Sequence, residues 1–62
     1  MPRIAAQFSI DLFDLDAGVD RVRAGPVAVD RGDRTREEFE DLLRKAIEEA
    51  VRFALDELEV AP

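Results

Sequence analysis

Residues 3–13 read RIAAQFSIDLF, and nearly every second residue of this stretch is apolar. Successive side chains of a β-strand point to opposite faces, so a period of two predicts a strand with one buried face. The side chains expected on that face are Ile4, Ala6, Phe8, Ile10 and Leu12. The chain therefore begins with a strand over about residues 3–13.

A turn and a second strand are predicted next. Residues 14–18 favour a turn, and Gly18 can adopt a positive φ. Residues 19–30 are rich in valine, which is typical of strands, but Gly25 and Pro26 interrupt the alternation. Because proline cannot donate a backbone hydrogen bond, we expect an edge strand, a bulge, or a break into two shorter strands.

The second half of the chain predicts one long helix. Thr35 and Glu38 have the spacing of a capping box, in which each side chain accepts a hydrogen bond from an otherwise unpaired backbone N–H. Apolar residues then recur at helical spacing, which predicts an amphipathic helix over about residues 36–58. Pairs spaced i, i+4 are expected on its polar face: Glu40–Arg44, Asp41–Lys45 and Glu48–Arg52. The predicted fold is α+β, a β-β-α domain covering residues 1–62.

The apolar arc of this helix is wider than one hairpin can cover. It spans about 180°, whereas a helix packed on one sheet needs little more than about 100°. We predict that the surplus forms a partner-binding patch of Ile47, Val51, Leu55 and Leu58, and that dimerisation completes the fold. The alternative is that the hairpin curls around the helix and covers the patch. Close packing along Ala46, Ala50 and Ala54 fits either helix-to-sheet or helix-to-helix contact.

Size supports association. A chain of 62 residues buries only about 60% of its unfolded surface and is marginally stable alone. It has no Cys and no His, which removes disulfides and the usual zinc ligands. Asp14, Asp16 and Asp20 surround a turn, but the spacing does not match a calcium loop, and we expect turn hydrogen bonds instead. We expect no metal and no cofactor.

Charge separates the two halves of the chain. Residues 1–36 hold six Arg and six Asp, whereas residues 37–62 carry the whole net charge of −6. A negative surface disfavours nucleic acid and anionic membranes. Five arginines cluster near the second strand and could pair with the acidic helix of a neighbouring chain, keep an edge strand solvated, or grip phosphate: Arg21, Arg23, Arg31, Arg34 and Arg36. We favour the first two.

Few residues could carry catalysis. Ser9 and Thr35 are the only hydroxyl side chains, and Thr35 is committed to the helix cap. Because no suitable base is expected beside Ser9, we predict that the chain is not an enzyme. No apolar run approaches the roughly 20 residues of a membrane span, and the start of the chain does not resemble a signal peptide, so a cytoplasmic location is expected.

Two functions remain. The first is a homodimeric or higher homo-oligomeric assembly module, which uses the apolar helix face and can also engage another protein. The second is an acidic inhibitor that occupies the basic, nucleic-acid-binding site of a larger target. A hairpin followed by the Thr35-Arg36-Glu37-Glu38 helix start resembles small antitoxin domains of the HicB type, although the third strand of that family has no counterpart. No function is transferred from that resemblance.

Overall fold

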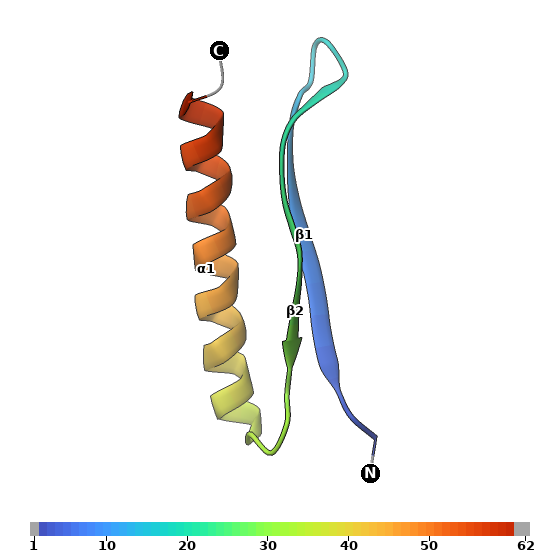
Figure 1. Ribbon diagram of the computed structural model, residues 1–62, viewed down its shortest axis with the longest axis vertical. Helices are drawn as coiled ribbons and strands as arrows, with labels where there is room; N and C mark the ends of the chain where they lie inside the picture. The colour runs from blue at the N-terminus through green and yellow to red at the C-terminus, as the bar shows by residue number, and fades with distance from the viewer. Residues whose placement is uncertain (1, 61–62) are drawn as a thin grey trace.

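The computed structural model describes residues 2–60, which form a two-stranded antiparallel hairpin followed by one helix (Figure 1). The elements are β1 (Ala5–Asp14), β2 (Val19–Asp30) and α1 (Arg36–Val60). The predicted α+β hairpin and helix are confirmed. β1 begins two residues later and ends one later than expected, and α1 extends two residues further. The early part of the predicted strand still contacts β2, because the carbonyl oxygen of Ile4 accepts a hydrogen bond of 2.8 Å from the Arg31 N–H.

The interruption in β2 is a bulge. Phe8 lies opposite Val27 and Ile10 lies opposite Ala24, so Ser9 alone faces the two residues between them. The additional residue shifts the phase of β2, and for that reason the side chains before and after the bulge share one face. The β2 residues opposite Leu12, Ile10, Phe8 and Ala6 are Val22, Ala24, Val27 and Val29. The predicted bulge is therefore confirmed, and β2 continues through it as one strand.

Glycine is required at one position of this bulge. Gly25 has a φ of 105°, which side-chain-bearing residues rarely adopt. A Cβ atom built on Gly25 would lie 3.0 Å from the carbonyl oxygen of Phe8 and 3.2 Å from the Cα of Ser9. The close approach of β1 and β2 at the bulge thus leaves no room for a side chain.

Helix α1 packs along the hairpin through alanines. It runs beside the strands, and its carboxyl end lies at the same end of the molecule as the β1–β2 turn (Figure 1). It contacts both strands, β2 more than β1. The buried apolar residues are Ala24 on β2 and Ala50 and Ala54 on α1, and Ala46 is half-buried. Within one chain, therefore, the small residues permit close contact between helix and sheet.

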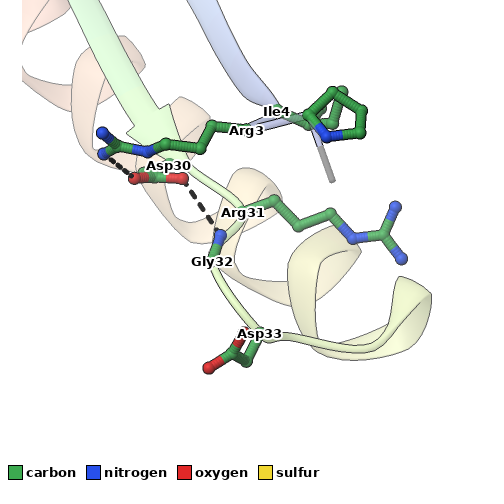
Figure 2. Close-up of a pocket in the computed structure, with 7 residues that line it drawn as sticks. Arg3, Ile4, Asp30, Arg31, Gly32 and Asp33 are labelled. Carbon is green, nitrogen blue, oxygen red and sulfur yellow. Dashed lines mark hydrogen bonds and ion pairs between the residues drawn. The ribbon is translucent and has the colours of Figure 1, made fainter.

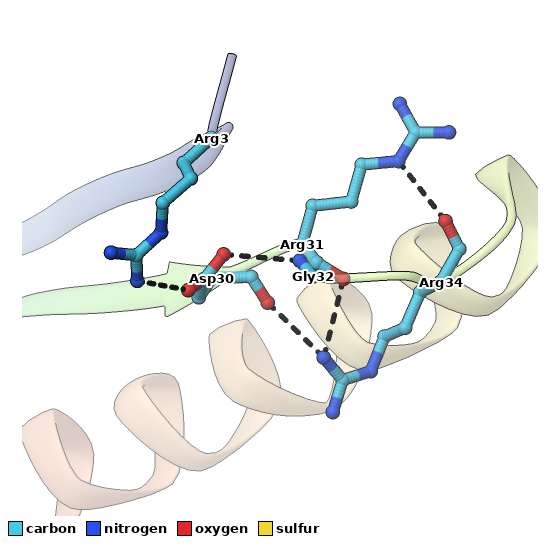
Figure 3. A network of polar contacts seen from close by, with 5 residues as sticks. All are labelled: Arg3, Asp30, Arg31, Gly32 and Arg34. Atoms are coloured by element: carbon cyan, nitrogen blue, oxygen red, sulfur yellow. Dashed lines mark hydrogen bonds and ion pairs between the residues drawn. The ribbon is translucent and has the colours of Figure 1, made fainter. Parts of the chain in front are cut away.

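A polar network fixes the loop between β2 and α1 (Figure 3). The Asp30 carboxylate accepts hydrogen bonds from the Arg3 guanidinium at 3.1 Å and from the Gly32 N–H at 3.0 Å. Arg34 donates to the carbonyl oxygens of Asp30 and Arg31 at 3.2 and 3.3 Å. The bond from Arg3, followed by that from Gly32, holds the pKa of Asp30 below its ordinary value of 3.8. The network ties the start of the chain to the loop that orients α1.

Candidate association surface

The four predicted partner-binding residues are exposed on one side of α1. Ile47, Val51, Leu55 and Leu58 have 44%, 40%, 48% and 39% of their surface accessible. At about 100° per residue they fall within about 80° of the helix circumference, so they form one stripe. We call these four residues the α1 stripe. The hairpin does not cover them.

The position of Phe53 shows toward which strand of the hairpin the α1 stripe lies. This residue is 53% exposed and lies on the other flank of α1, with Ala50 and Ala54 between it and the stripe. Phe53 lines one groove with Ala24 and Val27 of β2, and a second with β2 residues 21–23. Because Phe53 marks the β2 side of the helix, the α1 stripe lies on the flank toward β1.

The molecule exposes more surface than a compact chain of its mass. Its accessible surface is 5283 Å², against about 4,000 Å² expected for a folded monomer of 7.0 kDa. Its radius of gyration is 14.6 Å, against about 11 Å expected for a compact domain of this length. The extents of 46 × 19 × 13 Å describe a thin slab. One helix on one hairpin encloses almost no interior.

A second exposed apolar group lies around the hairpin turn. Phe13, Leu15 and Val19 are 56%, 84% and 55% exposed. Sequence reasoning missed this group because it treated residues 14–18 as a turn and followed only the even-numbered face of the first strand. The signal was present, since Phe13 departs from the alternation and Leu15 stands between two aspartates.

The arginine cluster is largely engaged within the chain. Arg23 donates to Asp11 at 2.8 Å, and the Arg31 guanidinium lies 5.9 Å from the centre of the Phe39 ring. Arg31 also lines an open depression of about 420 Å³, which includes Asp30 and Asp33 (Figure 2). Because carboxylates share this depression with the arginines, it is poorly suited to a phosphate group.

The acidic turn makes the hydrogen bonds expected of turn residues. The Asp14 carboxylate accepts from the N–H groups of Ala17 and Asp16 at 3.0 and 2.9 Å. These bonds, that of Ala17 first, lower the pKa of Asp14 below its ordinary value of 3.8. Residues 2–60 contain no cluster of three or more side chains able to hold a metal ion.

Two of the three predicted helix ion pairs form. Arg44 contacts Glu40 at 2.8 Å and Lys45 contacts Asp41 at 3.1 Å. The predicted pair of Glu48 with Arg52 is wrong, because these side chains form no ion pair in the described part of the chain. The side chains of all three pairs are exposed to solvent, so the i, i+4 spacing alone does not ensure that an ion pair forms.

The two hydroxyl side chains, Ser9 and Thr35, lie at exposed positions. Ser9 is exposed on the outer face of β1, opposite the bulge. Thr35 accepts a hydrogen bond from the Glu38 N–H, as the cap requires. No polar or charged side chain is buried among residues 2–60, and none of the described helices is long and apolar enough to cross a membrane.

Comparison with protein families, with characterised proteins and with solved structures finds no significant match to this chain. The HicB-type resemblance accordingly gains no support, and the described residues contain two strands, not three.

Proposed function

We propose that this chain is a small non-enzymatic assembly module that associates with a second copy of itself through the α1 stripe. The observation that carries the proposal is the continuous exposure of Ile47, Val51, Leu55 and Leu58 beside a core in which only alanines are buried and the larger apolar side chains are half-buried. Large apolar side chains in a contiguous group mark an interaction surface more often than a free one.

The large exposed surface of one chain supports association with a second copy. The chain exposes roughly 1,200 Å² more than a compact monomer of its mass, and a standard interface buries about 800 Å² on each partner. Because the larger apolar side chains of the core, such as Phe8, Leu12 and Leu43, are only half-buried in one chain, association supplies apolar burial that one copy lacks. A second copy presents the same exposed α1 stripe, and it is present at the same concentration as the first copy.

Solution mass tests this proposal. Light scattering across a range of protein concentrations should give the mass of two chains at high micromolar concentration. The melting temperature should rise with concentration, because association stabilises the folded state by mass action. A one-chain mass at every concentration, with an invariant melting temperature, contradicts the proposal.

One observation favours the second candidate, an acidic inhibitor of a basic site. Asp56, Glu57 and Glu59 lie near the carboxyl end of α1, and the last turn holds no basic residue. Negative charge there opposes the helix dipole and costs stability. An electrostatic partner would explain this placement. Such a complex weakens as ionic strength rises, whereas self-association through apolar side chains persists.

A further inference from the structure

The two edges of the hairpin differ in their capacity to pair with another strand. β2 is interrupted by the bulge at Gly25 and Pro26 and carries Arg21 and Arg23, features that block edge pairing. β1 reads AAQFSIDLFD and contains no proline, glycine, lysine or arginine. The two charged residues of β1, Asp11 and Asp14, lie toward the turn, so the β1 edge carries no charge and no strand-breaking residue over residues 5–10.

The backbone groups of the β1 edge can be assigned. The Ile4 carbonyl oxygen accepts from Arg31, so the backbone of Ile4 is directed toward β2. Backbone groups alternate between the two sides of a strand, so those of Ala6, Phe8 and Ile10 also face β2. The N–H and C=O groups of the odd-numbered residues, including Gln7 and Ser9, consequently point to the free edge.

Nothing among residues 2–60 covers this edge. β1 has β2 as its single neighbour in the sheet, and α1 contacts β2 more than β1. Near the amino terminus, β1 lies on the far side of β2 from the helix (Figure 1). An uncovered row of backbone donors and acceptors is a template for another strand.

We propose that β1 pairs antiparallel with β1 of a second copy, forming one four-stranded sheet in the order β2-β1-β1-β2. This inference rests on the proposed self-association and specifies its geometry. An antiparallel register that pairs even with even residues keeps Ala6, Phe8 and Ile10 of both copies on the helix side. Both helices then lie on the same face of the sheet.

The dimensions of this dimer fit the α1 stripe. Neighbouring strands are about 4.8 Å apart, so the centres of two adjoining hairpins are about 10 Å apart. Because α1 contacts β2 more than β1, each helix is displaced toward the outer strand, and the two helix axes lie somewhat farther apart than the hairpin centres. Packed helices are separated by about 8–10 Å, so large side chains on the facing flanks are needed to fill the remaining space. The flanks that meet are those toward β1, where Ile47, Val51, Leu55 and Leu58 lie. Edge pairing and the stripe thus form one continuous interface.

A pair of proline variants tests the edge. Gln7 and Ala28 lie directly opposite each other in the hairpin, are both exposed, and both direct the N–H away from the partner strand. Gln7→Pro removes a donor from the β1 edge without removing a hairpin bond, and Ala28→Pro does the same at the β2 edge. We expect Gln7→Pro to raise the dimer dissociation constant about tenfold or more, because edge bonds are lost in both copies. Ala28→Pro should retain the parent constant.

Amide hydrogen exchange on the unmodified chain gives a second readout. In the dimer the Gln7 and Ser9 amides should exchange more slowly than that of Ala28, and the difference should disappear on dilution to the monomer. If circular dichroism shows that Gln7→Pro does not fold, hydrogen exchange on the unmodified chain still tests whether the β1 edge is paired in the dimer.

Two outcomes overturn the edge pairing. If Gln7→Pro dimerises as tightly as the parent, or if the amides of Gln7 and Ala28 exchange alike in the dimer, the β1 edge is not the interface. Self-association through the α1 stripe then still stands. A parent chain that is monomeric at every concentration refutes both proposals.

Discussion

Thr35 and Glu38 cap α1 by exchanging hydrogen bonds across the first turn. The Thr35 N–H donates to the Glu38 carboxylate at 2.9 Å, and the Glu38 N–H donates to the Thr35 hydroxyl at 3.2 Å. Each side chain thereby satisfies a donor that the helix leaves unpaired. The bond from the Thr35 backbone N–H to the Glu38 carboxylate, followed by hydrogen bonding with the Thr35 side chain, lowers the pKa of Glu38 below its ordinary value of 4.5.

Removing the cap should weaken the fold but not the association. Thr35→Ala should lower the free energy of unfolding by about 1 kcal/mol, the usual effect of losing an N-cap oxygen. Urea denaturation measures this loss, and light scattering should report an unchanged mass. Thr35→Ser is the matched control and should retain most of the stability. Equal stability of the alanine variant and the parent would show that the cap contributes nothing.

Substitution at the bulge should be far more damaging than at the hairpin turn. Gly25→Ala should cost about 3 kcal/mol, because it combines backbone strain with the 3.0 Å approach to Phe8. Gly18→Ala is the control: its φ is also positive, at 68°, but its Cβ would meet nothing within 4 Å. We expect it to cost only about 1 kcal/mol. Similar losses in thermal melts of the two variants would contradict the close contact at the bulge.

A carboxylate in the α1 stripe should separate the chains. Leu55→Glu would bury an unpaired charge in each copy and bring two like charges near one another, both of which are strongly disfavoured. Light scattering should then give the mass of one chain. Phe53→Glu alters a residue of similar exposure on the β2 flank and should leave the mass unchanged. If both variants keep the parent mass, the apolar group at the hairpin turn becomes the alternative interface.

Acid should destabilise the fold through three carboxylates. The pKa values of Asp14, Asp30 and Glu38 are lowered by the hydrogen bonds these groups accept. Groups with a lower pKa in the folded state stabilise it above the unfolded pKa, and this contribution is lost as pH falls through the folded pKa. The melting temperature should therefore fall as pH decreases below about 4.

Asp30→Asn tests that assignment. The variant has no carboxylate to titrate at the loop network, so its melting temperature should depend less on pH in the acidic range than that of the parent. Asp33→Asn is the control in the same loop, where the carboxylate makes no hydrogen bond to residues 2–60. An equal pH dependence in parent and Asp30→Asn would exclude Asp30 from acid destabilisation.

Local signals in the sequence predicted most of the fold. Strand alternation, the cap at Thr35 and helical spacing each depend on neighbours within a few residues, and all three were confirmed. The Gly25-Pro26 interruption predicted a bulge among other outcomes, but only the pairing with β1 shows that it restores the phase of β2. Which flank of α1 faces β1 depends on the loop around Asp30, where the bond from Arg3 joins residues that are distant in sequence.

The bulge also has a consequence for the size of the assembly. In the proposed pair each chain contributes β1 to the centre of the sheet, so both outer strands are copies of β2. Each outer edge then carries Pro26 and the irregular backbone around it, which cannot accept a further strand in register. A hairpin with two open edges would instead add chains without limit and grow into a fibre. Pro26 therefore prevents a further strand from pairing with either outer edge, and the assembly is limited to two chains.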